Sequence, residues 1–359
     1  MPYDGLEVDM LSVGNADCIF VTRWYAASNS WSCVLIDGGN SGDIDTLRSF
    51  LNSRGISRIN AVVCTHPHDD HSGGLLELLK DKKIQIDSAY MHVPQWHINP
   101  LDVEKTLRRV AGSAEADSIR KSLATAKDLL TAVTARGLTV IEPFAGVKVE
   151  FLTVVGPSQE YYEELIGEFT DAESIKLIDV RNDLHKVWSA LHDHTIEDLD
   201  TELPADPQTT PENNSSTILA VVQNYDKYLF TSDAGVPALQ KAAEKYNLSG
   251  CHWMQIPHHG SRRNINPALI KHFSPKSAWV SAEGSKKHPR RAVVNAFKAA
   301  GSVVFSSHYP TSTNMWIQTG TVPARTGYKP LVPLYEATSL SKMFPPPGNI
   351  GFTDLNKTR

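Results

Sequence analysis

The sequence predicts an α/β protein in which helices pack on a sheet. The first part of the chain runs in the order strand, strand, helix, strand, helix, which is the layout of a sheet covered by helices. Hydrophobic residues make up 41% of the 359 residues, which is enough apolar material for a sizeable core. These two observations set the fold class.

The first half of the chain supplies the elements of that order. Residues 6–21 alternate apolar and polar residues around a glycine turn, which predicts two strands. Residues 31–36 predict a third strand and residues 44–54 an amphipathic helix. Residues 59–64 form an apolar, β-branched run, which predicts a buried strand. A helix is expected to begin at Leu75.

A histidine-rich motif follows the strand at 59–64 and supplies His66, His68, Asp70 and His71. Because residues two apart on an extended or turning backbone point the same way, His66 and His68 can share one cation. Asp70 and His71 would face a second cation, and such metal pairs sit roughly 3.5–4 Å apart. Mixed imidazole and carboxylate ligands suit Zn²⁺, Fe or Mn²⁺ better than Ca²⁺ or Mg²⁺. A histidine-rich surface turn is the alternative, and the density of ligand-type residues counts against it.

Two helical insertions are predicted, at about residues 97–137 and 158–212, with strands at 138–141 and 147–155 between them. Basic residues in the first insertion either face solvent or meet a polyanion, and a solvated helix face is the more common case. The second insertion is long and polar. Since connections of this length are usually functional or disordered, we interpret it as a lid or substrate-binding element.

Strands in both halves end in ligand-type residues. The strand at 31–36 ends in Asp37, which can fix the tautomer of a ligand histidine. A strand at 227–230 leads to Asp233, which has the chemistry of a bridging carboxylate. A strand at 253–256 leads to His258 and His259, and either histidine can supply the last metal nitrogen. We assign His258 to the metal and His259 to the substrate. The repeated placement predicts one shared site.

The chain is expected to form one domain over residues 1–308, ending in a last strand at 303–307. Residues 309–359 are rich in Pro, Gly and Thr, which predicts an irregular C-terminal extension packed on the core. The net charge of −5 gives no global basic character for nucleic-acid binding. The sequence has no apolar run of the ~20 residues that a membrane helix needs, so a soluble, cytoplasmic protein with reduced cysteines is expected.

The motifs together resemble the metallo-β-lactamase superfamily. Within it, residues 13–17, 35–39, 213–216, 232–234 and 258–261 look like the ComEC-like branch, which includes the hydrolase domain of DNA-uptake proteins and phosphorylcholine esterases. The resemblance implies an αββα sandwich with a two-metal site at one edge of its sheets. It also implies one metal held by His66, His68 and Asp233, and another held by Asp70, His71, Asp233 and His258.

One departure from the family pattern concerns the first metal. Many superfamily members place a histidine where this chain has Asn213, Asn214 and Ser215. The first metal would then lack its third nitrogen, which leaves a position for water or a phosphate oxygen. The choice of metal stays open between Zn²⁺ and Mn²⁺.

The leading functional hypothesis is hydrolysis of a phosphodiester by a hydroxide bound to two metals, with Asp70 and Asp233 holding the pair. Asn214 and Ser215 would donate to a phosphate oxygen, and His259 or His288 would protonate the leaving group. A basic cluster around His288 would bind a phosphate backbone. That cluster consists of Lys286, Lys287, Arg290 and Arg291.

Three readings compete with a general phosphodiesterase. The sharpest version is a nuclease, with single-stranded DNA or a nucleotide as partner. Another enzyme class would hydrolyse a lactone, thioester or other carboxyl ester, because the same hydroxide attacks a carbonyl carbon. Outside enzymes, the chain would be a metal-stabilised binding or regulatory module.

Overall fold

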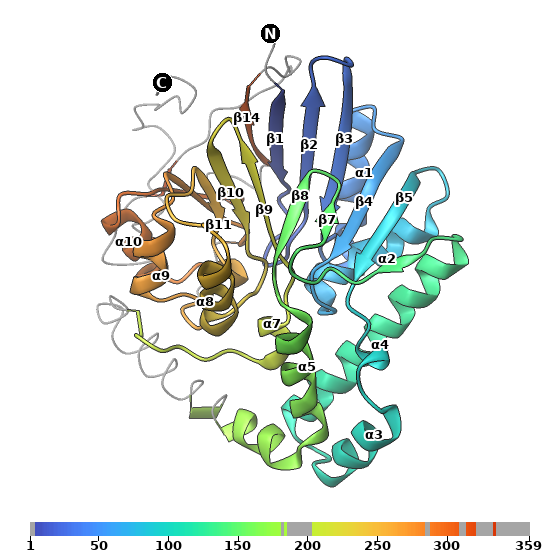
Figure 1. Cartoon of the computed structure of the whole chain (residues 1–359). Helices are drawn as coiled ribbons and strands as arrows, with labels where there is room; N and C mark the ends of the chain where they lie inside the picture. Colours follow the sequence, from blue (N-terminus) through green and yellow to red (C-terminus); the bar gives the residue numbers. More distant parts are fainter. Residues whose placement is uncertain are drawn as a thin grey trace.

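Two seven-stranded sheets lie against each other, and helices cover both outer faces (Figure 1). The computed structural model describes residues 4–180, 183–184, 203–283, 288–308, 314–320 and 333–334. This four-layer arrangement confirms the predicted α/β class and the αββα sandwich that the resemblance implies.

The first sheet has the strand order β14-β1-β2-β3-β4-β5-β6. Each neighbouring pair in the series β14, β1, β2 and β3 is antiparallel, whereas β3, β4, β5 and β6 run parallel. Because β3 and β4 are parallel neighbours, the loops that follow them meet at one edge. The bounds are β1 Gly5–Met10, β2 Ile19–Tyr25, β3 Ser30–Ile36, β4 Arg58–Cys64, β5 Gln85–Met91, β6 Val140–Ile141 and β14 Met315–Thr319.

The second sheet has the order β13-β12-β11-β10-β9-β8-β7, and its strands β10 to β13 are parallel. The carboxyl ends of β10 and β11 lead to Asp233 and His258, so these residues also share one edge. The bounds are β7 Lys148–Val149, β8 Leu152–Gly156, β9 Ile218–Gln223, β10 Asp226–Phe230, β11 Trp253–Gln255, β12 Ser277–Val280 and β13 Val303–Ser306.

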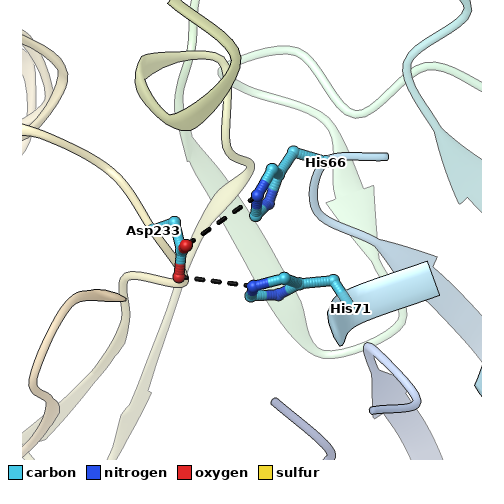
Figure 2. A group of neighbouring side chains, drawn as sticks. All are labelled: His66, His71 and Asp233. Carbon is cyan, nitrogen blue, oxygen red and sulfur yellow. Dashed lines mark ion pairs between the residues drawn. The ribbon is translucent and has the colours of Figure 1, made fainter. Parts of the chain in front are cut away.

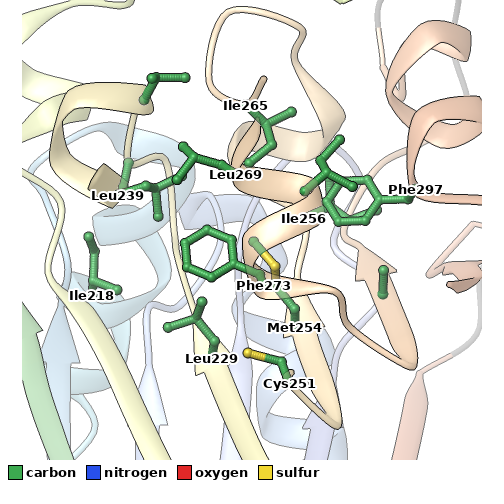
Figure 3. Close-up of a cluster of buried hydrophobic side chains, with 14 of the residues drawn as sticks. Ile218, Leu229, Leu239, Cys251, Met254, Ile256, Ile265, Leu269, Phe273 and Phe297 are labelled. Atoms are coloured by element: carbon green, nitrogen blue, oxygen red, sulfur yellow. The ribbon is translucent and has the colours of Figure 1, made fainter. Parts of the chain in front are cut away.

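Three apolar cores hold the layers together. Between the sheets, a buried cluster joins both halves of the chain, with Val8 and Val63 from the first sheet and Trp253 and Trp279 from the second. A second core lies under α1 (Ile44–Ser53) and α2 (Asp69–Lys80), on the first sheet. A third lies under α8 (Val236–Lys245), α9 (Pro267–Phe273) and α10 (Arg291–Ala299), on the second sheet (Figure 3). Burial of these apolar surfaces supplies the main favourable term in folding.

The insertion helices build a separate apolar cluster. Helices α3 (Pro100–Arg109), α4 (Ala114–Ala135) and α5 (Gln159–Gly167) pack together with the turn η3 (Glu168–Thr170) and a helix over residues 172–180. The short helix α7 (Pro211–Asn214) then returns the chain to the sheets. Residues 185–202 of the predicted lid lie outside the described residues.

The helix after the histidine motif begins earlier than the sequence indicates. Helix α2 starts at Asp69 rather than Leu75, so Asp70 and His71 lie in its first turn. Two aspartates in the first turn stabilise a helix N-terminus through the helix dipole. Gly73 and Gly74 lie inside the helix because the backbone of residues 38–41 passes against them, and a Cβ at either position would overlap that backbone.

The prediction of a last strand at 303–307 and an irregular extension after it was wrong in part. Residues Met315–Thr319 form β14, which pairs with β1 and lengthens the first sheet. The open edge of β1 provides this pairing, which no local pattern reveals. Leu334 is fully buried in the core of the second sheet. The rest of the predicted extension lies outside the described residues.

No described helix is both long and apolar enough to cross a membrane. All four cysteines are buried free thiols.

Candidate metal centre

The ligand-type residues converge where the two sheets meet at one edge. The loop after β4 carries His66 and His68, the first turn of α2 carries Asp70 and His71, and the loop after β10 carries Asp233. Figure 2 shows His66 and His71 from one half of the chain turned toward Asp233 from the other half. The ligand-type residues that follow the different strands therefore lie together in a single site.

Asp233 lies between two histidines. Its Oδ1 is 3.4 Å from His71 Nε2 and its Oδ2 is 3.9 Å from His66 Nε2 (Figure 2). Its side chain is 1% exposed. His66 Nε2 also lies 3.0 Å from His68 Nδ1. Each oxygen of Asp233 thus faces a different imidazole, which is the arrangement that a bridging carboxylate needs.

Asp70, His71 and His259 form a second group. Asp70 Oδ2 lies 3.3 Å from His259 Nε2 and 3.9 Å from His71 Nε2. One ligand atom from each of the three residues lies within 4.8 Å of the other two, and the same holds for His66, His71 and Asp233. Since His71 belongs to both groups, the two groups are contiguous.

The two adjacent histidines lie differently around the cluster. Both lie in the turn η4 (His258–Gly260) with positive φ, which turns the second imidazole inward. The side chain of His259 is 2% exposed and completes the group with Asp70. His258 is 26% exposed, and its Nε2 lies 3.4 Å from Asp233 Oδ2. Among the described residues, His259 is thus the histidine grouped with Asp70 and His71, and the assignment of His258 to the metal and His259 to the substrate stays a prediction.

Hydrogen bonds fix the orientation of the inward histidines. His71 Nδ1 lies 2.8 Å from Asp37 Oδ2, and Asp37 also accepts hydrogen bonds from the backbone N–H and hydroxyl of Thr65. His259 Nδ1 donates to the carbonyl of Ser281 at 2.9 Å. Because each Nδ1 has its own partner, each Nε2 is presented to the centre of the cluster.

Charge is balanced within the cluster by its own residues. Burial lowers the pKa of His71, but the carboxylates of Asp233, Asp70 and Asp37 outweigh burial and hold this pKa well above its ordinary value. Burial raises the pKa of Asp233, but His258 and His71 outweigh it and hold the pKa well below its usual range. A divalent cation would take the place of the imidazolium protons.

The residues fit a pair of divalent cations. Among the described residues, four buried atoms at the cluster have no hydrogen-bond partner, namely Nε2 of His68, His71 and His259 and Oδ1 of Asp233. Unpaired buried nitrogen and oxygen atoms are costly unless a ligand satisfies them. Imidazole with carboxylate is a donor set that Zn²⁺ and Mn²⁺ both accept.

Asp17 and Gln255 belong to the site although sequence reasoning gave them no role. Asp17 Oδ2 lies 3.8 Å from His71 Nδ1 and accepts a 2.7 Å hydrogen bond from Gln255 Nε2. Burial raises the pKa of Asp17 to about 6, although the nearby His259 and His71 lower it. Gln255 Oε1 accepts the backbone N–H groups of Thr231 and Ser232, just before Asp233. Gln255 therefore ties the Asp233 loop to the first half of the chain.

Asn214 and Ser215 lie at the site, and the hydroxyl proton of Ser215 is already used. The Ser215 hydroxyl donates to the carbonyl of Glu212 at 2.7 Å, which uses its single proton. Donation from Ser215 to a phosphate oxygen stays a prediction, and it would require this hydrogen bond to break. Asn214 is buried with its Oδ1 against Gly235, where a Cβ would overlap it.

The predicted basic cluster is only partly described. The buried ring of His288 lies 5.8 Å from that of His258 and 6.1 Å from that of His259, between ring centres. The backbone N–H of Arg290 donates to the carbonyl of Gly260 at 3.0 Å, which places the start of α10 beside η4. Lys286 and Lys287 lie outside the described residues.

Comparisons with known proteins agree on the family. Residues 14–143 match the family described as Metallo-beta-lactamase superfamily. ComE operon protein 3 of Bacillus subtilis (strain 168) is 21% identical over 308 residues, which are 80% of this chain and 30% of that protein. This chain thus spans about 30% of the length of the curated relative that it matches.

Two solved structures are also similar. A crystal structure titled as a new diphosphatase from the PhnP family has 12% identity and a TM-score of 0.38, covering 89% of this chain and 100% of that one. Unliganded yeast PDE1 has 10% identity and a TM-score of 0.39, covering 83% of this chain and 94% of that one. Residues 14–143 thus match the metallo-β-lactamase superfamily, and the similarity to ComE operon protein 3 supports the ComEC-like branch within it.

Proposed function

We propose that this chain is a metal-dependent phosphodiesterase. The observation that carries the proposal is the buried cluster of imidazole nitrogens and carboxylate oxygens, several of them without a hydrogen-bond partner, brought together from strand ends of both sheets. His66, His68 and Asp233 would hold one divalent cation, Zn²⁺ or Mn²⁺. Asp70, His71, His259 and Asp233 would hold the other.

Bound cations of this kind supply Lewis acidity and make water nucleophilic near neutral pH. The chain contributes the geometry around them. Asp37 and Ser281 hold the two imidazoles of His71 and His259 in one tautomer each. Gln255 holds the loop that presents Asp233. In the reaction the water gives up a proton and its oxygen bonds to phosphorus, the P–O bond to the leaving alcohol breaks, and the leaving oxygen takes up a proton.

We assign the proton transfer to a histidine outside the cluster. His258 is partly exposed beside Asp233, and the ring of His288 lies 5.8 Å from its own. Both rings therefore lie close enough to the cluster to be the proton donor in this proposal. His259 is removed from this role because its Nε2 faces Asp70 and its Nδ1 is bonded to Ser281.

A small diester suits the described surface better than a DNA strand. The basic side chains of the first insertion are largely neutralised by neighbouring acids. Examples are the pairs of Arg108 with Glu104 at 2.7 Å and Arg120 with Asp117 at 2.8 Å. A row of paired cations offers little counterion release to a polyanion. The nuclease version therefore ranks behind a phosphodiesterase of small substrates.

The test compares ester classes on metal-loaded protein. We expect bis(p-nitrophenyl) phosphate to be hydrolysed with Zn²⁺ or Mn²⁺, and Asp70→Ala to lower kcat/KM at least about 100-fold, since it removes a group that holds the reaction geometry. Asp69→Ala is the matched control, because Asp69 is the exposed neighbour and pairs with Lys121. Its activity should stay within about threefold of wild type.

Other outcomes contradict the proposal. Turnover of p-nitrophenyl acetate without turnover of any phosphodiester would show a carboxyl-ester hydrolase. Binding of two metal ions without hydrolysis of an ester of any class would show a binding or regulatory module. Degradation of single-stranded DNA in preference to small diesters would restore the nuclease version.

A further inference from the structure

A small cavity lies next to the metal centre, and the two helical insertions supply six of its thirteen lining residues. His66 and Ser215 line it on the side of the cluster. Tyr162 and Ile166 of α5 and Ser122 of α4 line the opposite side. The insertions therefore shape the space beside His66, while the sheets supply the ligands.

The cavity contains buried polar atoms that the described residues do not satisfy. Ser122 is 3% exposed and His92 is 5% exposed, and both line the cavity. Neither Ser122 Oγ nor His92 Nδ1 has a hydrogen-bond partner among the described residues. Because an unpaired buried polar atom costs roughly 1–3 kcal/mol, the two atoms indicate a place for a ligand group.

The neighbours of His92 determine which kind of group fits. The hydroxyl of Thr217 donates to the carbonyl of Thr65 at 3.4 Å, so its oxygen can accept the N–H of His92 Nε2, 3.3 Å away. His92 Nδ1 is then an acceptor. Burial lowers the pKa of His92 to about 3, so the ring is neutral. Its ring stacks on Tyr162 at 4.4 Å between centres, which fixes its plane.

The size of the cavity limits the occupant. The space open to the centre of a water molecule is about 20 Å³. A buried water needs about 10–15 Å³ of such space, so the cavity holds the end of a small group and no ring. The side walls are apolar, with Met91, Ile166 and Phe169 among them.

We propose that this cavity binds the ester group that stays on phosphorus, and that it selects a small hydroxyalkyl group through a hydrogen bond to His92 Nδ1. The proposal rests on the phosphodiesterase function proposed above and adds the substrate class: diesters of phosphate with a short hydroxyalkyl alcohol. His92 acts as a specificity-determining residue, and Ser122 can complete the hydrogen bonding of the same hydroxyl.

The experiment uses three p-nitrophenyl phosphodiesters, whose second ester group is ethyl, 2-hydroxyethyl or phenyl. For wild type we expect kcat/KM for the hydroxyethyl ester to exceed that for the ethyl ester by about tenfold, the size of one buried hydrogen bond. His92→Phe keeps an aromatic ring against Tyr162 and removes the acceptor, so the ratio should fall to about one. An unchanged ratio in His92→Phe, or no preference in wild type, would overturn the proposal.

A second variant tests the size limit independently. Ile166→Ala enlarges the cavity and should raise the phenyl-to-ethyl ratio of kcat/KM about tenfold. Ile175→Ala is the matched control, because Ile175 is buried in the same insertion cluster but does not line the cavity. Equal ratios in the two variants would show that the cavity does not receive the ester group.

A binding measurement separates this proposal from the function itself. If no diester is hydrolysed, the proposed function fails, and the pocket is judged by calorimetry on metal-loaded protein. The probes are 2-hydroxyethyl methyl phosphate and ethyl methyl phosphate. About tenfold tighter binding of the hydroxyethyl compound in wild type, lost in His92→Phe, supports the pocket. Equal affinities mean that the cavity holds only water.

Discussion

The free energy of unfolding should depend on pH because of two buried glutamates that lie between the first helical insertion and the metal centre. Glu115 on α4 and Glu212 on α7 are 3% and 2% exposed. Burial, followed by the charge of Glu212, raises the pKa of Glu115 from 4.5 to about 9. Asp179 raises this pKa further and Arg263 lowers it. The folded protein therefore keeps a proton on Glu115 that the unfolded chain releases above pH 4.5.

The sign and size of the effect follow from proton linkage. Between pH 4.5 and 9 the folded state binds more protons at Glu115 than the unfolded state, so stability falls as pH rises. From pH 5 to pH 8 this group alone should remove about 4 kcal/mol, since one pKa unit is worth about 1.4 kcal/mol. Glu115→Gln carries no titratable proton, so this loss should disappear in the variant.

The assay is urea unfolding at pH 5 and pH 8 in the presence of a chelator, for wild type and Glu115→Gln. We expect the free energy of unfolding of wild type to drop by about 4 kcal/mol more than that of the variant. Glu244→Gln on the exposed face of α8 controls for the loss of one carboxyl group. Parallel pH dependence of wild type and Glu115→Gln, within about 1 kcal/mol, would refute the reasoning.

Two further predictions concern the metal centre and its supports. Elemental analysis of purified variants should find that His259→Ala loses about one bound metal ion per chain relative to wild type, while His258→Ala keeps its full complement. The reason is that, among the described residues, His259 completes the group with Asp70. The opposite result would return His258 to the ligand set. Gly74→Ala should destabilise the fold by more than about 3 kcal/mol in urea unfolding, because a Cβ there overlaps the backbone of residue 38. Gly42→Ala, where a Cβ meets open space, should change stability by less than about 1 kcal/mol, and equal effects in the two variants would contradict the close approach.

The sequence by itself determined which strands carry the site. Two local patterns can be recognised without knowledge of the fold. One is an apolar run followed by a histidine-rich turn, and the other is a strand followed by Asp233. Asp37 was found the same way, from its place directly after a strand. Because parallel strands end at the same edge, the pattern alone predicted that these residues meet.

The local sequence pattern does not determine which of two neighbouring histidines points into the cluster. His258 and His259 are chemically identical and adjacent, and only the left-handed backbone of η4 decides which imidazole turns inward. The hydroxyl of Ser215, predicted to donate to a phosphate oxygen, donates to the carbonyl of Glu212 in the structure. Neither the orientation of the two histidines nor the hydrogen bond of Ser215 can be predicted from residue type or spacing.

Tertiary structure alone decided the contacts that join the two halves of the chain. Asp17 and Gln255 are 238 positions apart and form one hydrogen bond at 2.7 Å. Strand β14 pairs with β1 from the other end of the described chain. Such contacts depend on how the two sheets pack. This packing is set by apolar side chains, whose partners cannot be identified from residue type. The sequence determined which ligand-type residues follow the strands, and the packing of the two sheets decided which side chains they contact.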